Sequence, residues 1–384
     1  MVIRMEQLGD EYLSHAVDLV KVENELRRVV TRNLRSLREQ LMSKLMSIDP
    51  TEPGPARWKR QRVEKLFNQT STTINSIYKG MRTESDEFLT DFARVEADYN
   101  VNMPNQILRA PVLSTSLSAA TIRELGKSTL IEGASSREWW TRQERAVRAK
   151  FEDQIRQGML AGEHLGQLRQ RIRGVHTGKF RTYRDSSGVL KRAGIFRGGV
   201  MGATTQQADA LARTSVQAVN NQVRQEVYKA NDDVVGGSEW LATLDNRTTD
   251  ICRALDGERW DHDYKPLVKG MTYPGPTAHW GERSTTIPWL LPLEAISGGK
   301  LKTIPDETRA SIGGQVPAKT SYNDWFKKQP EADQLEILGP TKLRLYKQNS
   351  LSFRDMVKGS GVPLTIGQLE TKIARKGFKP FKNK

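Results

Sequence analysis

The feature of the sequence that most restricts the fold is a long run of helix-forming residues near its start. From residue 5 to residue 47, apolar side chains recur mostly at steps of three and four, which places them on one face of a helix. These residues are Leu13, Val17, Val20, Leu26, Val30, Leu34, Leu37, Leu41 and Leu45. The segment IDPTEPGP, at 48–55, then ends the helix, because proline has no amide hydrogen to donate.

A second long helix is expected from about residue 55 to residue 100. Its apolar positions also suit one buried face. The residues on this face are Val63, Leu66, Ile74, Ile77, Met81, Phe88 and Phe92. Two long antiparallel helices with few aromatic residues suit a hairpin that packs on something else, such as another subunit. We therefore expect residues 1–105 to form a long helical hairpin that contacts a partner.

The middle of the chain is expected to begin with a loop or linker at 103–120 and to continue with helices. Ser135 or Ser136 suits the cap of the first helix, and Thr204 or Thr205 suits the cap of the last. The expected helices are 136–158, 162–175 and 204–231.

Strands are expected in the same part of the chain. An alternation of side chains around Trp240 predicts a strand at 236–245, and a second strand is expected at 284–293. The glycine-rich, basic segment 174–203 suits a hairpin with its turn at 185–188.

The last part of the chain is expected to be helical. Short helical patterns follow one another from about residue 305, and the tail 371–384 is basic and expected to be frayed. The fold class is therefore α+β. It combines the helical hairpin, a central domain over 106–300 with helices and a small β-sheet, and a small helical C-terminal domain over 301–384.

The charge of the chain points to a polyanionic partner. The formal net charge is +15 at pH 7, and such an excess attracts polyanions and releases their counterions. Nucleic acid is the first candidate, and a merely soluble basic protein is the alternative. One cysteine cannot form an intramolecular disulfide, and we find neither a signal peptide nor a membrane span. We expect a cytosol-like environment.

The acidic residues around the one cysteine, Cys252, were tested as a metal or catalytic site. Structural zinc sites use four Cys or His ligands, but this sequence has no Cys-x-x-Cys and no His-Glu-x-x-His pattern. Cys252 and His279 lack a second pair, and Asp245, Asp250 and Asp256 match no calcium loop. No nucleophile motif or dinucleotide fingerprint is present. We expect no metal, no cofactor and no catalytic residue.

The segment around the predicted hairpin combines cations with aromatic residues. The segment contains nine cationic residues and one acidic residue, Asp185. Phe180, Tyr183 and Phe196 lie among the cations in the sequence. Cations reach phosphates, and aromatic faces stack on bases or insert between strands. The segment is a candidate for non-specific nucleic-acid contact, and a solvated loop or a loop that docks an acidic protein is the alternative. The candidate DNA-binding residues are Arg169, Arg171, Arg173, Lys179, Arg181, Arg184, Lys191, Arg192 and Arg197.

The order of motifs over about 200–292 is distinctive. A helix with an Arg-Thr pair near its start leads to a tryptophan strand, the segment NRTTDICRALDGERW, a proline-glycine loop and a strand that starts ERSTTIPWL. This order resembles the minor head protein family of tailed bacteriophages, the head-morphogenesis domain of the Mu type. Segment 312–357 also resembles the tail domain often found downstream in such proteins. The matching residues are Arg213, Thr214, Asn220, Arg224, Trp240, Asp245, Arg247, Thr248, Cys252, Leu255, Asp256, Gly257, His279 and Arg283.

The sequence departs from the family pattern at its cysteines. The first motif cysteine of the family aligns with Thr249, and the closing cysteines align with Glu282 and Ser284. If the family cysteines form a zinc or redox brace, this chain has lost it. We expect Cys252 to be buried and inert, and a charge-assisted pair to replace the brace. The candidate pairs are Asp245 or Asp256 with Arg247 or Arg283.

The resemblance implies a structural protein and not an enzyme. It implies a minor capsid protein that is bound to the portal protein inside the head, oligomeric in the virion, and present in the host cytoplasm during assembly. Its partners would be the portal, the major capsid or scaffold proteins, and packaged double-stranded DNA. The alternatives are a metal-dependent enzyme that acts on DNA or the envelope, and a host-side nucleic-acid-binding protein.

Overall fold

The chain folds into two units, each of which is assembled from separate parts of the sequence. The computed structural model describes residues 2–47, 60–184, 189–268, 270–275, 277–280, 282–292, 302–304, 309–317 and 319–375. Unit 1 comprises Met1–Val20, Asp91–Leu125 and Gln217–Lys384, and unit 2 comprises Lys21–Thr90 and Gly126–Val216. The division at residues 105 and 300 that we expected from the sequence stays a prediction.

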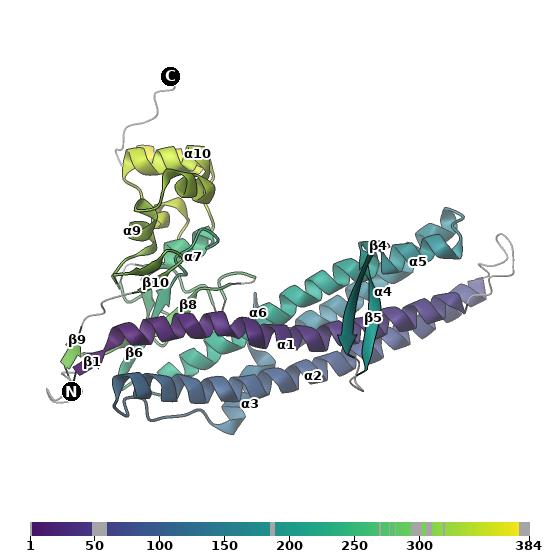
Figure 1. The fold of residues 1–384 in the computed structure, drawn as a ribbon, viewed down its shortest axis with the longest axis horizontal. Coiled ribbons are helices and arrows are strands. Elements are labelled where there is room, and N and C mark those ends of the chain that lie inside the picture. Colours follow the sequence, from purple (N-terminus) through teal and green to yellow (C-terminus); the bar gives the residue numbers. More distant parts are fainter. Residues whose placement is uncertain are drawn as a thin grey trace, which may run out of the picture. The chain divides into compact units, whose positions relative to one another are not determined.

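The two long N-terminal helices are present and contribute to both units. Helix α1 covers Met5–Met46 and α2 covers Arg60–Leu108 (Figure 1). Buried positions in both helices repeat every 11 residues. One series is Leu8, Leu19, Val30 and Leu41 in α1, and another is Thr70, Met81, Phe92 and Met103 in α2. Eleven residues in three turns give about 3.67 residues per turn, close to the 3.6 of a straight helix, so each buried stripe stays on one side.

The end of α2 differs from the sequence prediction. We expected a loop from residue 103, but the helix continues to Leu108 with Pro104 inside it. Met103 and Leu108 are buried. The Asn105 side chain donates to the Leu113 carbonyl at 2.6 Å and accepts from the Leu113 amide at 2.8 Å. This packing and these bonds hold the last turns, although Pro104 has no amide hydrogen to donate.

In unit 2, the long helices pack on helices of the same chain. Glu144 of helix α4 (Ser136–Leu160) accepts hydrogen bonds from Asn75 of α2 at 3.2 Å and from Arg82 of α2 at 2.7 Å. Ser135 caps α4 by accepting from the Glu138 amide, as the sequence predicts. The other elements of this unit are β2 (Leu130–Ile131), β3 (Ala134–Ser135), α5 (Leu165–Arg173), β4 (Val175–Arg184), β5 (Leu190–Arg197) and the first part of α6 (Gly199–Lys229).

Helix α6 begins earlier than the sequence predicts. The expected start was residue 204 with Thr204 or Thr205 as the cap, but the helix begins at Gly199. Both threonine hydroxyls donate to carbonyls one turn earlier, those of Val200 and Met201, at 2.8 Å. The cap assignment was therefore wrong, because these hydroxyls lie inside the helix. Burial of Val200 and Met201 outweighs the low helix propensity of the glycines around them.

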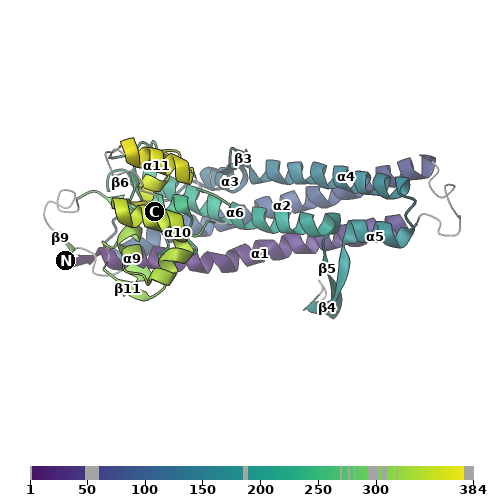
Figure 2. The same cartoon turned by 90° about the horizontal axis from the view of Figure 1, so that it is seen from above.

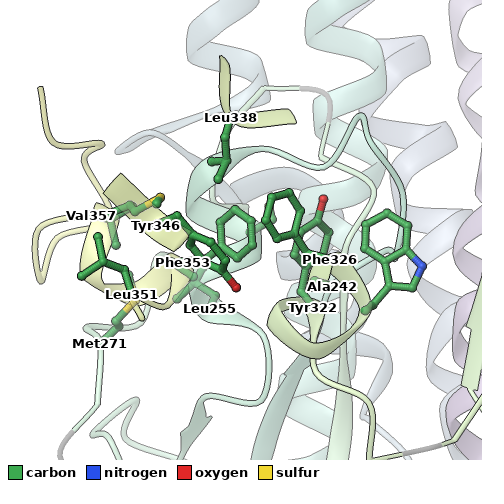
Figure 3. Packing of buried hydrophobic residues seen from close by; sticks show 14 of the residues in the cluster. Ala242, Leu255, Met271, Tyr322, Phe326, Leu338, Tyr346, Leu351, Phe353 and Val357 are labelled. Atoms are coloured by element: carbon green, nitrogen blue, oxygen red, sulfur yellow. The ribbon is translucent and has the colours of Figure 1, made fainter. Parts of the chain in front are cut away.

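Unit 1 is built around a small antiparallel sheet and a cluster of helices. The sheet has the order β7-β6-β8, and Trp240 of β6 pairs with Thr286 of β8. Figure 3 shows the core beside it, where the ring of Phe353 packs edge to face against the rings of Tyr322 and Phe326. The elements of this unit that have not yet been named are β1 (Val2–Arg4), α3 (Ala119–Ser128, which extends into unit 2), β6 (Val235–Leu241), α7 (Asp250–Leu255), β7 (Arg259–Trp260), β8 (Thr285–Leu290), β9 (Lys302–Ile304), β10 (Arg309–Ser311), β11 (Gly314–Val316), α9 (Tyr322–Lys327), α10 (Glu331–Asn349), η2 (Phe353–Met356) and α11 (Ile366–Arg375).

The C-terminal segment is helical as expected, with three differences. The short strands β9, β10 and β11 precede its helices and were not predicted. Two expected helices join as α10 across a kink at Gly339. The tail that we expected to be frayed includes the last turns of α11 up to Arg375, and its remainder lies outside the described residues. In the described part of the chain, no helix has the length and apolar character needed to cross a membrane.

Candidate functional sites in the motif segment and the basic hairpin

The turn after β6 is organised by the carboxylate of Asp245. It accepts hydrogen bonds from the backbone amides of Arg247 and Thr248 at 2.9 and 2.8 Å, which makes an Asx-turn. Arg283 donates to both of its oxygens, at 2.6 and 3.0 Å. Burial acts to raise the pKa of Asp245, but the bonds from Arg283 and Thr248 outweigh it, and the pKa is lowered. The Asp245–Arg283 pair is one of those that the sequence suggested, whereas Arg247 contributes its backbone amide.

Asp256 forms a second and more deeply buried pair. Its side chain is 4% exposed, and the Arg309 side chain is 8% exposed. Arg309 donates to the two carboxylate oxygens at 2.7 and 3.2 Å. The same carboxylate accepts the backbone amides of Ala242 at 2.8 Å and Tyr322 at 2.7 Å. Asp256 therefore ties β6 to the C-terminal helices, and the partners expected for it, Arg247 or Arg283, were wrong.

Cys252 lies in a cluster with the residues that replace the family cysteines. Its sulfur lies 3.2 Å from Nε2 of His279 and donates to Oε1 of Glu282 at 3.6 Å. The Thr249 hydroxyl lies 2.9 Å from the same His279 nitrogen, and Ser284 is also bonded to the cysteine. The fold thus brings together the five positions that the resemblance identifies as cysteines and histidine.

The chemical state of this cluster does not suit a zinc site. Burial raises the pKa of Glu282 to about 8, although the bond from the Ala278 amide acts to lower it. Burial and the neighbouring Glu282 also raise the pKa of the Cys252 thiol. Zinc binds thiolates and neutral imidazoles in sets of four, whereas here one buried thiol keeps its proton. Among the residues that the structure describes, no group of three His, Cys, Asp or Glu side chains is arranged to hold a metal ion.

Other residues of the matching pattern are part of the core. Arg224 is fully buried and donates to Asn100, Asn220 and the Thr286 carbonyl at 3.1, 3.2 and 2.9 Å. It also donates to the Thr285 hydroxyl, and its guanidinium lies over the Tyr12 ring. Because these acceptors satisfy its hydrogen-bonding groups, the buried charge is tolerated.

The remaining residues of the pattern differ in exposure. Trp240 is buried, and its carbonyl accepts the Gly257 amide at 2.9 Å. Gly257 has φ 79°, a conformation that favours glycine. Arg213 of α6 is exposed, and its Nε donates to the Asp209 carbonyl at 3.4 Å. These contacts are compatible with the structural role that we expected, which stays a prediction.

The basic hairpin is an antiparallel pair of β4 and β5. Its register pairs His176 with Phe196 and Phe180 with Gly194, with an irregularity between His176 and Phe180. The His176 ring centroid lies 5.0 Å from both phenylalanine rings. The guanidinium of Arg173 lies 4.2 Å from the Phe196 centroid, and that of Arg192 lies 4.1 Å from the Phe180 centroid. Aromatic rings and cations therefore share one face of the hairpin.

The ends of the hairpin approach closely at two glycines. Gly174 has φ 88°, and a Cβ added there would lie 2.4 Å from the Arg197 carbonyl oxygen. Gly199 has φ 67°, and a Cβ added there would lie 2.4 Å from the Gly174 nitrogen. Any larger residue at either position would have to displace backbone atoms, so the two glycines fix the base of the hairpin.

The nine candidate cations have different surroundings. Arg171 donates to Glu163 at 2.6 and 2.7 Å, so its charge is balanced. Within the described residues, five others have no ion pair with a carboxylate: Arg169, Arg173, Lys179, Arg192 and Arg197. Burial and the neighbouring Arg169 lower the pKa of Arg173, as expected for crowded positive charges. The backbones of Arg181, Arg184 and Lys191 are in the hairpin strands, and their side chains lie outside the described part of the chain, as does the expected turn.

A comparison with known protein families finds a match to one segment of the chain, which contains both the turn after β6 and the basic hairpin. Residues 149–287 match the sequence model of the family described as phage Mu protein F like protein. Over this segment, the chain is similar to the phage Mu protein F-like family. The family is one of phage head morphogenesis. No curated protein and no solved structure matches the chain. The Mu F-like segment contains the basic hairpin, the Asx-turn and the Cys252 cluster.

Two partners of the predicted site residues, Arg309 and Glu163, were not identified from the sequence. Arg309 lies outside the Mu F-like segment, 53 residues after its partner Asp256, and nothing in the local pattern links the two. Glu163 lies next to the basic segment, and an acid eight residues before Arg171 was the available signal that this arginine is balanced.

Proposed function

We propose that this protein is a minor capsid protein of a tailed bacteriophage, bound to the portal protein inside the head. In this role it aids procapsid assembly with the major capsid or scaffold proteins, and it aids the packaging or ejection of DNA. It would be oligomeric in the virion and pass through the host cytoplasm during assembly. The match of residues 149–287 to the Mu F-like family carries the proposal, and the net charge of +15 suits a protein beside packed DNA.

The proposed DNA contact is the basic hairpin. Five of its candidate cations have no carboxylate partner among the described residues, and Lys179, Arg192 and Arg197 are exposed. Exposed and unbalanced cations on a projecting element can reach phosphates without a competing acid. Arg171 is left out of the proposed contact because Glu163 balances it. Contact with phosphates alone carries no sequence information, so the binding is non-specific.

The experiment replaces Lys179, Arg192 and Arg197 together by glutamine and measures binding to a duplex over a series of salt concentrations. Each lost phosphate contact should lower the salt slope by about 1, so the triple variant should lose about 3. The matched control is the Glu163→Gln, Arg171→Gln double variant, which removes a balanced pair and should keep the slope. An unchanged slope in the triple variant would show that the hairpin is not the contact.

A second experiment tests the location. Purified particles are treated with protease, and the chain is quantified by mass spectrometry before and after opening of the heads. A protein inside the head is present in the particles and protected until they open. Absence from the particles would favour the host-side alternative.

We also propose that the protein is not an enzyme. The metal-dependent alternative needs Asp245 and Asp256 as ligands or catalysts. Both carboxylates instead hold arginines and backbone amides at 2.6–3.2 Å. The proposal expects Asp245→Asn to lower stability, and an activity lost without any change in stability would contradict it.

A further inference from the structure

The far half of the basic hairpin exposes apolar side chains to solvent. Phe180 is 50% exposed, Val189 is 54% exposed and Leu190 is 62% exposed. Leu190 pairs with Arg184 at the end of the hairpin that leads to the turn. Figure 2 shows this part of β4 and β5 extending beyond the helices beside it. A two-stranded hairpin has no core of its own, so folding leaves half or more of each of these side chains in contact with water.

The apolar and cationic side chains are combined on one face. Phe180 lies opposite Gly194, and Thr182 lies opposite Arg192. The glycine leaves the ring without a cross-strand side chain, and the Arg192 guanidinium lies over the ring instead. A ligand for this face must therefore accept the positive charges of Arg192 and of Arg173, which lies over Phe196, and must also offer apolar surface.

Double-stranded DNA meets both requirements. Strands of DNA-binding β-ribbons enter the major or the minor groove, and both grooves have phosphates on either side. Architectural proteins that bind DNA also insert apolar side chains between base steps, which unstacks the bases and bends the duplex. An acidic protein surface would match the cations, but it would give Leu190 and Phe180 no such apolar slot.

We propose that the hairpin of β4 and β5 is a DNA-bending arm, which places its cations on the phosphates and inserts Leu190 and Phe180 between base pairs. This inference rests on the DNA contact proposed above and adds a deformation of the duplex to it. The cations provide the attraction, and the apolar side chains hold the bend. Binding should therefore depend on how easily the DNA bends as well as on salt.

The test uses the full chain and a duplex of about 30 base pairs with a fluorescent donor at one end and an acceptor at the other. Saturation with the protein should raise energy transfer, because a bend brings the ends together. The Phe180→Ala, Leu190→Thr variant should bind with the same salt slope and with an affinity within about tenfold, and without the rise. Val175→Thr is the matched control, since Val175 is an equally exposed residue at the base of the hairpin, 59% exposed.

A second experiment uses a duplex with a mismatch at its centre. Because a flexible step lowers the deformation energy, the protein should bind this duplex at least about fivefold more tightly than the matched one. The double variant should show no preference. Circular dichroism checks that it folds, and if it does not, the two single variants replace it.

The outcomes separate the two proposals. Binding at saturation without any rise in energy transfer overturns the bending arm and leaves the DNA contact in place. A rise that persists in the double variant also overturns it. No binding to any duplex at low salt overturns the DNA contact itself. Binding to polyglutamate as tight as to the duplex would assign the hairpin to acidic proteins and overturn the bending arm.

Discussion

Arg309 and Arg192 are the same residue type in opposite situations. Arg309 is 7% exposed and donates to Asp256, to the Ala242 carbonyl and to the Thr320 carbonyl. Arg192 is exposed and lies over a ring, with no carboxylate partner in the described residues. A buried charge is tolerated when it is paired and hydrogen-bonded, whereas an exposed one costs little and stays available. In the buried part of unit 1, arginine therefore stabilises the fold, whereas the hairpin exposes an arginine that can bind a partner.

The largest expected effect is at Asp256. Asp256→Ala leaves Arg309 without its counter-charge and leaves two backbone amides unbonded. Breaking a buried pair in this way costs about 3–5 kcal/mol of unfolding free energy, and we expect the upper end. Urea denaturation followed by tryptophan fluorescence measures it, because Trp240, Trp260 and Trp325 are in this core. Asp263→Ala is the control, since Asp263 is exposed and should change the midpoint little.

The next effect is a dependence of stability on pH caused by Glu282. Below about pH 4.5 this group is protonated in both the folded and the unfolded chain. Between its ordinary pKa of 4.5 and its folded-state pKa of about 8, only the folded chain keeps the proton, so the contribution of Glu282 to stability falls as pH rises. Each unit of pKa corresponds to about 1.4 kcal/mol, so the loss over the three units from pH 5 to pH 8 amounts to about 4 kcal/mol.

The test for this effect is Glu282→Gln, with unfolding midpoints measured from pH 5 to pH 9. The glutamine can still accept the Ala278 amide, but it does not titrate. We expect the variant to lose stability less steeply than the wild type as the pH rises, and to be the more stable of the two at pH 9. Parallel curves for the two proteins would show that Glu282 does not titrate in this range.

The smallest expected effect on stability is at Arg192. Arg192→Gln removes a cation–π contact on the surface, and we expect a change below about 1 kcal/mol in unfolding free energy. The same substitution at Arg309 is the matched comparison and should cost several times more. If the two variants lost equal stability, the contrast between a bonded and an available arginine would be wrong.

The secondary-structure elements were predicted from the sequence more accurately than the hydrogen-bond partners of the site residues. The stripe of α1 was recognisable from Leu26 to Leu45, where every predicted apolar residue is buried. Before Leu26 the prediction was wrong at Val20, which is 48% exposed, because the buried face there contains Leu19. The start of α6 was missed because Gly199 and Gly202 suggest a break, and only the burial of Val200 and Met201 shows otherwise.

For the candidate sites, membership of the family pattern decided which pairs could be predicted. Asp245 and Arg283 belong to one family pattern, which made their pairing predictable. Arg309 pairs with Asp256 only because the folded chain returns to β6. The raised pKa of Glu282 comes from its burial, and no local pattern contains that information.

The 11-residue period of α1 and α2 restricts how these helices can change in length. One inserted residue turns everything beyond it by about 100°, which would move the rest of the buried stripe toward solvent. Eleven inserted residues turn it by slightly more than three whole rotations and restore the stripe. We therefore expect small insertions or deletions inside these helices to expose buried side chains and lower stability, and we expect the insertion or deletion of a whole repeat to preserve the stripe. The lengths of the two helices are therefore expected to change in steps of 11 residues.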